Sequence, residues 1–153
     1  MSAKVKGRFS KILVAIDGSQ TSMDAADYAT EMARKDGAQL IALTVNRLPF
    51  SSYGITTPQD ESEHLKEKEE VHESKQWFDK ISQNAQQNNV QLKTDLVNSQ
   101  MSIEGAIIEY AESNGVDLIV IGTKGSSALK KVLLGSVASG VVTYATCPVM
   151  VVK

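Results

Sequence analysis

Five short apolar runs, separated by segments with helical periodicity, are the feature that most restricts how this chain folds. Strands that alternate with helices form βαβ units, and such units build a parallel sheet. We therefore expect an α/β fold with one open parallel sheet. The length of 153 residues is typical of one domain, so we predict a single domain over residues 1–153. The predicted strands are residues 11–16, 39–45, 91–97, 118–121 and 149–152.

Capping residues and glycines mark the helices between these runs. The first predicted helix begins near Ser19 or Thr21, and Gly37 is placed to end it in a left-handed conformation. The third predicted helix ends in the same way, at Asn114-Gly115. The second helix is the longest, roughly Pro58–Gln87, and the fourth covers roughly residues 136–145.

The character of each apolar run indicates its place in the sheet. Residues 12–16 and 118–121 are continuously apolar, which is typical of central strands covered on both faces. Residues 91–97 alternate with polar neighbours, and the last run follows Pro148, so both of these strands are expected at edges. The run Val149–Val152 forms a bare apolar edge of the kind that pairs with another chain.

Composition and charge exclude several classes of protein. The formal net charge of −2 gives no general attraction to nucleic acid or to an acidic membrane surface. No segment approaches the roughly 20 apolar residues of a membrane helix. The single cysteine, Cys147, cannot form an internal disulfide. We expect a soluble, cytoplasmic protein that binds neither nucleic acid nor membrane.

A glycine-rich stretch follows the predicted strand at 118–121. Two residues separate Gly122 from Gly125, and nine separate Gly125 from Gly135. Glycines let backbone N–H groups approach a polyanion, and a helix N-terminus adds free donors and partial positive charge. Ser136 would add a hydroxyl and cap the helix. The spacing predicts a phosphate site, with a loop that merely needs three turns as the alternative. The stretch also contains Thr123, Lys124, Ser126, Lys130 and Lys131.

Asp17 follows the first predicted strand. In open α/β sheets, ligands bind beyond the carboxyl ends of the strands where the winding direction reverses. A strand order of 3-2-1-4-5 would place Asp17 opposite Gly122 at that reversal, where its carboxylate can accept hydrogen bonds from ribose hydroxyls. The alternative, equally weighted from the residues alone, is that Asp17 only caps the first helix.

Taken together, these motifs resemble the ATP-binding universal stress proteins. The resemblance lies in the spacing G-x2-G-x9-G-[ST], in the ending Pro-Val-x-Val-Val, and in the opening run 11–19 with its Asp17. It implies a Rossmann-like, adenine nucleotide alpha hydrolase-like fold: a five-stranded parallel sheet in the order 3-2-1-4-5 with two helices on each face. It also implies ATP as ligand and a homodimer that forms through Val149–Val152.

The resemblance assigns roles residue by residue. By this similarity Asp17 meets the ribose, Ala15, Ile16 and Val45 border the adenine, and the glycine motif holds the phosphates and ribose through Gly122, Gly125, Gly135, Ser136 and Val137. Because no cluster of carboxylates is visible, a Mg²⁺ ion would be carried on the phosphates. The family's frequent Gly-x-Pro turn after the third strand is absent from residues 97–102. In this segment Met101 is the candidate lid residue over the adenine.

The leading hypothesis for function is a nucleotide-dependent sensor or switch in a stress response, and not a dedicated enzyme. A slow ATPase is the competing hypothesis, although no positioned base for water is found. A third is a dimeric scaffold that binds AMP or a cyclic nucleotide. The two histidines, His64 and His72, lie in a charged helix, which leaves no Ser-His-Asp or Cys-His arrangement.

Overall fold

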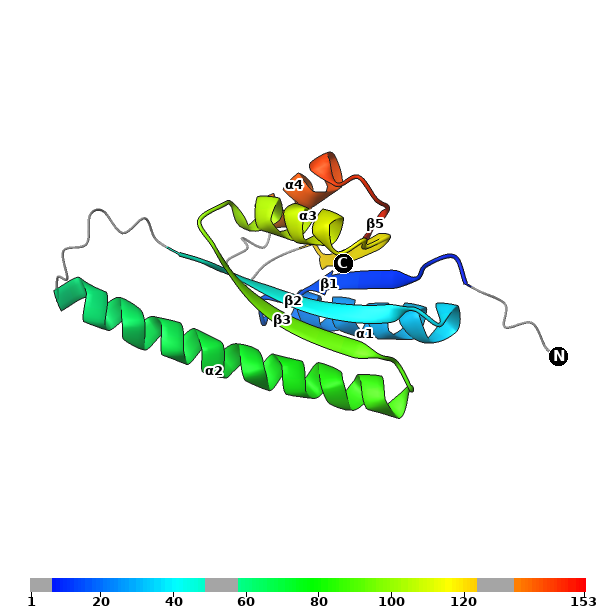
Figure 1. Ribbon diagram of the computed structural model, residues 1–153, viewed down its shortest axis with the longest axis horizontal. Helices are drawn as coiled ribbons and strands as arrows, with labels where there is room; N and C mark the ends of the chain where they lie inside the picture. The colour runs from blue at the N-terminus through cyan, green and yellow to red at the C-terminus, as the bar shows by residue number, and fades with distance from the viewer. Residues whose placement is uncertain (1–6, 49–57, 124–133) are drawn as a thin grey trace.

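The computed structural model describes residues 7–48, 58–123 and 134–153. Its described strands form one parallel sheet in the order β3-β2-β1-β4-β5, which confirms the predicted topology (Figure 1). The strands are β1 (Lys11–Ala15), β2 (Gln39–Arg47), β3 (Leu92–Ser99), β4 (Leu118–Gly122) and β5 (Val149–Val152). The helices are α1 (Gln20–Asp36), α2 (Pro58–Gln87), α3 (Ile103–Ser113) and α4 (Ser136–Tyr144).

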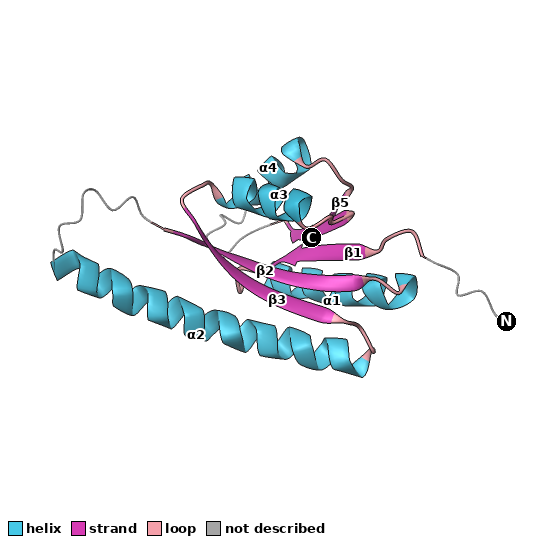
Figure 2. Cartoon of the chain, viewed as in Figure 1, coloured by secondary structure: helices cyan, strands magenta, loops and turns pink. Residues whose placement is uncertain are grey.

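Two apolar cores lie on the two faces of the sheet because successive side chains of a strand point to opposite sides. In β1, Ile12 and Val14 belong to the first core and Leu13 to the second. Helices α1 and α2 pack over the first core, and α3 and α4 pack over the second (Figure 2). The arrangement of two helices on each face is confirmed. Among the described helices, none is long and apolar enough to cross a membrane.

The predicted start and end of α1 are confirmed, and α3 also begins at a capping serine. Ser19 is the N-cap of α1, and its side chain accepts a hydrogen bond from the amide of Ser22. Gly37 ends α1 at φ 65°, in the left-handed region that glycine occupies without strain. Ser102 caps α3 by accepting from the amide of Gly105. These caps give α1 a defined start and stop, and α3 a defined start, beside the sheet.

Strands β2 and β3 are longer than their apolar runs predict. Their register continues through Asn46↔Asn98 and Arg47↔Ser99, and the amide of Leu48 donates to the carbonyl oxygen of Ser99 at 2.8 Å. The backbone ladder needs only N–H and C=O groups, so it extends past the last apolar side chains. Conversely, β1 ends at Ala15, one residue before the predicted end.

The described packing contacts of helix α2 with the body of the protein lie in its second half. Ser74 and Ile81 are buried, and Trp77 and Phe78 pack against the first core. By contrast, the described side chains that precede Ser74, at positions 68, 69 and 71–73, are all exposed. Figure 1 shows the first half of α2 running past the end of the sheet.

Candidate functional site

The winding direction of the sheet reverses between β1 and β4. These two strands are parallel neighbours, with Val14 opposite Val120, although they lie far apart in the sequence. Their carboxyl ends therefore bring Ala15 to Asp17 close to the end of β4 and to Thr123. This is the position at which open α/β sheets bind ligands.

Gly122 packs closely on the first turn of α1. A Cβ atom at Gly122 would lie 2.9 Å from both the carbonyl carbon and Oγ1 of Thr21. The absence of a side chain at this position therefore has a structural reason inside the protein itself. The close approach sets the end of β4 against the start of α1, which follows the Asp17 turn.

Thr123 connects β4 to two further elements. Its amide donates to the carbonyl oxygen of Val152 at 2.8 Å, and its carbonyl oxygen accepts from the amide of Gly135 at 2.6 Å. Thr123 is also buried, at 4% exposure. The end of β4, the end of β5 and the start of α4 are thus held together by backbone hydrogen bonds.

Among the described residues, none caps the start of α4 with a side chain. Gly135 is the N-cap residue, in an extended conformation with φ −64° and ψ 164°, and Ser136 is already the first helical residue. The prediction that Ser136 caps this helix is therefore wrong, because the cap position precedes the first residue with helical dihedral angles. The first-turn amides of a helix have no intrahelical partners, so this end can receive an anion.

The Asp17 carboxylate braces the start of α1. Asp17 is exposed, and its Oδ1 accepts hydrogen bonds from the amide of Ser19, at 2.9 Å, and from the Ser19 hydroxyl. Ser19 is the N-cap, so Asp17 supports the cap and is not the cap itself. Asp17 thus stabilises this turn, and its carboxylate also lies at the surface.

The predicted adenine contacts divide between the two faces of the sheet. Ala15 and Val45 are half-buried and pack against the second core, as does Val137. The side chain of Ile16 is 3% exposed and lies in the first core. Its amide donates to the carbonyl oxygen of Leu43 at 2.8 Å. The structure therefore brings Ala15, Val45 and Val137 to one face and places the side chain of Ile16 on the other.

Several predicted site residues fall outside the described part of the chain. Among them are Lys124, Gly125, Ser126, Lys130 and Lys131. In the described ranges 7–48, 58–123 and 134–153, no three His, Cys, Asp or Glu side chains form a group that could hold a metal ion. Sequence reasoning missed one described neighbour of the Asp17 turn, Trp77, whose indole packs on Gly18. No local pattern signals this contact, because it joins residues far apart in the sequence.

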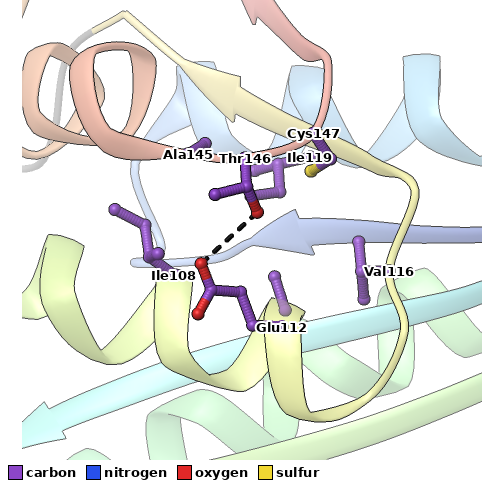
Figure 3. Close-up of a pocket in the computed structure, with 8 residues that line it drawn as sticks. Ile108, Glu112, Val116, Ile119, Ala145, Thr146 and Cys147 are labelled. Atoms are coloured by element: carbon purple, nitrogen blue, oxygen red, sulfur yellow. Dashed lines mark hydrogen bonds between the residues drawn. The ribbon is translucent and has the colours of Figure 1, made fainter.

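A small hollow lies apart from these residues, beside the amino-terminal half of β4 (Figure 3). There the Thr146 hydroxyl donates to Glu112 at 3.3 Å. Burial raises the pKa of the neighbouring Cys147 thiol, with Asp117 and Glu112 acting in the same direction. A thiol held in its neutral form is a poor nucleophile, so this hollow offers no reactive group. It is lined by Ile108, Ala111, Glu112, Val116, Ile119, Ala145, Thr146 and Cys147.

Comparison with known proteins finds similarity over nearly the whole chain. The model of the universal stress protein family matches residues 8–153. Universal stress protein YxiE of Bacillus subtilis is 35% identical, over 95% of this chain and 99% of its own length. Universal stress protein MJ0531 of Methanocaldococcus jannaschii is 34% identical, over 95% of this chain and 82% of its own length.

Solved structures share the fold. UspA from Lactobacillus plantarum superposes with a TM-score of 0.76 at 29% identity, and covers 96% of this chain and 99% of its own. Two more distant neighbours, each 23% identical and with a TM-score of 0.65, are a universal stress protein in complex with cAMP and one from Archaeoglobus fulgidus in complex with dAMP. These cover 95% and 94% of this chain, and 97% and 98% of their own. By sequence and by fold, this chain belongs to the universal stress protein family.

Proposed function

We propose that the protein binds an adenine nucleotide, with ATP as the main ligand, beyond the carboxyl ends of β1 and β4, and acts as a nucleotide-dependent switch in a stress response. The observation that carries the proposal is the start of α4, where the N-cap residue is Gly135, which has no side chain to bond the first-turn amides. The nucleotide complexes of the two distant neighbours agree with this class of ligand.

The phosphates would bind at the start of α4. The N-terminal amides of a helix carry partial positive charge and point toward an incoming anion. Ser136 and Val137 supply the first of these amides, and Gly135 adds no side chain that would obstruct the approach. Gly122, Thr123, Lys124, Gly125 and Ser126 complete the proposed phosphate segment, and Mg²⁺ would arrive on the phosphates.

The nucleoside would lie between the Asp17 turn and the half-buried apolar side chains of the second core. The exposed carboxylate of Asp17 can accept the hydrogen bonds that ribose hydroxyls would donate. Ala15 and Val45 offer apolar surface to the adenine. Ile16, whose side chain lies on the other face, would contribute only backbone at this border.

A homodimer through β5 forms part of the proposal. β5 is an edge strand of the described sheet, and unpaired strand edges favour pairing with another copy. On α4, the exposed Val142 and Tyr144, at 46% and 71% exposure, add apolar surface. A nucleotide bound beside the start of α4 would change the surface that a partner meets there, and a difference in that surface would signal the nucleotide state.

The first test uses the unaltered protein. Native mass spectrometry after purification should show a dimer that carries adenine nucleotide. In a thermal shift series at equal concentrations of ATP, AMP and cAMP, the tightest ligand gives the largest shift, and we expect this to be ATP. A ligand at about 100 times its Kd adds about 2.7 kcal/mol of stability. A larger shift with cAMP would instead favour the cyclic-nucleotide scaffold. No shift with any of the three would refute nucleotide binding.

A matched pair of substitutions tests the phosphate position. Gly135→Asp and Gly135→Asn both supply a side-chain cap to α4, so neither should lower the melting temperature of the free protein. Asp adds a negative charge where phosphate is proposed and should weaken ATP binding by about tenfold or more, equal to about 1.4 kcal/mol. Asn should weaken binding less. Equal ATP affinity in Gly135→Asp and the unaltered protein would refute this position.

A further inference from the structure

The indole ring of Trp77 lies directly on the Cα atom of Gly18. A Cβ atom at Gly18 would be 2.2 Å from Cζ2 and 2.4 Å from Cε2 of that ring. Gly18 also has φ +83°, a conformation that other residues rarely adopt. Both the ring and the backbone angle therefore require glycine at this position.

Gly18 is the single residue between the Asp17 carboxylate and the cap of α1. The amide of Ser19 donates to Asp17 Oδ1 at 2.9 Å, and the amide of Ser22 donates to Ser19 Oγ at 3.2 Å. The position of the carboxylate thus depends on the backbone angles of Gly18. Glycine has the greatest conformational freedom of all residues, so something else must restrict it here.

We propose that Trp77 is a positioning residue of the nucleotide site, whose ring holds the Gly18 turn so that the Asp17 carboxylate is preorganised for the ribose hydroxyls. This inference rests on the proposed function and assigns a residue of α2 to the same site. Preorganised groups bind more tightly because less ordering is left for the moment of binding.

The anchoring of Trp77 supports this role. Trp77 packs against the first core together with Phe78 and Ile81 of the same helix, so the ring is held from its own side. The described side chains of α2 before Ser74 are exposed, so Trp77 lies near the point where α2 leaves the body of the protein. The ring therefore joins the packed half of α2 to the Asp17 turn.

The test is a double-mutant cycle between Trp77 and Asp17, measured by calorimetric titration with ATP. Trp77→Ala should weaken ATP binding by about tenfold, and Asp17→Asn by a similar factor. Because the two substitutions act through the same carboxylate, the double variant should bind ATP as tightly as the single variant with the lower affinity. Dideoxy-ATP, which lacks the ribose 2′ and 3′ hydroxyls, should bind Trp77→Ala and the unaltered protein equally.

Three further variants separate positioning from general stability. Trp77→Leu keeps an apolar side chain in the core if Trp77→Ala fails to fold, and should lose affinity as Ala does. Trp77→Phe keeps a planar ring and should recover most of the affinity. Ile81→Ala removes a buried residue one turn further along α2 and should lower the melting temperature while the Kd for ATP stays unchanged.

The outcomes are distinct for the two proposals. If the unaltered protein binds no adenine nucleotide, the proposed function and the role of Trp77 both fail. If the unaltered protein binds ATP, two results overturn the role of Trp77 alone. One is an undiminished affinity in Trp77→Leu and Trp77→Ala. The other is a loss that is equal for ATP and dideoxy-ATP and additive with Asp17→Asn.

Discussion

The Tyr110 hydroxyl donates a hydrogen bond of 2.9 Å to the Asp95 carboxylate and so fastens α3 to the edge strand β3. Burial, followed by the hydrogen bond and charge of Asp95, raises the pKa of Tyr110 to about 12 from an ordinary value of 10.0. Folding therefore favours the neutral phenol. Its stabilising contribution is complete below the unfolded pKa and is lost as the pH rises through the folded pKa.

Replacing Tyr110 with Phe should change how stability depends on alkaline pH. Urea denaturation of the unaltered protein should show an added loss of unfolding free energy between pH 10 and about 12, because in this interval the unfolded phenol ionises while the folded one keeps its proton. Tyr110→Phe should lack this component and show a smaller decline over the same interval. Parallel pH curves for the two proteins would contradict the assignment.

Gly122→Ala should destabilise the protein through steric overlap. The new Cβ would lie 2.9 Å from the backbone of Thr21, so the first turn of α1 must shift, at a cost of about 1–3 kcal/mol. Chemical denaturation measures the cost.

Gly37 provides the matched control, since it has open space around it and a φ of 65°. Gly37→Ala should also destabilise, by about 1–2 kcal/mol, because of its backbone angle. Asn tolerates that angle and should recover most of the loss at Gly37 but none at Gly122. Undiminished stability of Gly122→Ala would contradict the prediction, because the first turn of α1 would then shift without loss of unfolding free energy.

Cys147 should react slowly with iodoacetamide in the folded protein. Burial raises the pKa of its thiol above the ordinary value of 9.0, and only the thiolate reacts. The rate measured against pH should therefore inflect above pH 9.0 in the native protein and near the ordinary value in urea. An inflection at or below the urea value in the folded protein would contradict the prediction.

Trp77 is the chain's single tryptophan, and it packs on the turn that presents Asp17. Saturation with ATP should therefore change the tryptophan emission spectrum, because ligand contact at Asp17 alters the surroundings of the ring. Trp77→Phe gives the background emission without tryptophan, and free N-acetyl-tryptophanamide titrated with ATP corrects for absorption by the nucleotide. An emission spectrum that stays constant while the thermal shift reports binding would place the ligand away from this turn.

The central and edge positions of the strands were predictable because the hydrophobic pattern reports burial directly, whereas the full strand order and the two helices on each face came from the family resemblance. The continuously apolar run that became β4 is buried at every position. The ends of β2 and β3 were not predictable in the same way. Asn46 and Asn98 pair through backbone groups, which every residue type supplies, so their side chains leave no mark in the pattern.

The site shows the same division. The start of α4 after the glycine motif was predicted, whereas the cap was assigned one residue late, to Ser136. The separation of Ile16 from Ala15 could have been predicted, since adjacent residues at the end of a strand point to opposite faces. The contact of Trp77 with Gly18 could not, because it depends on the angle at which α2 crosses the sheet.

The part of α2 that runs past the end of the sheet gives that crossing angle a mechanical consequence (Figure 1). At 1.5 Å per residue, residues 58–73 rise about 24 Å from the point where the helix meets the core. The displacement of a rigid rod held at one end grows with distance from its support, so a tilt of about 10° at that point would displace the far end by about 4 Å. A small rotation beside the half-buried Trp77 would thus displace the amino-terminal end of α2 by a distance large enough for another macromolecule to distinguish.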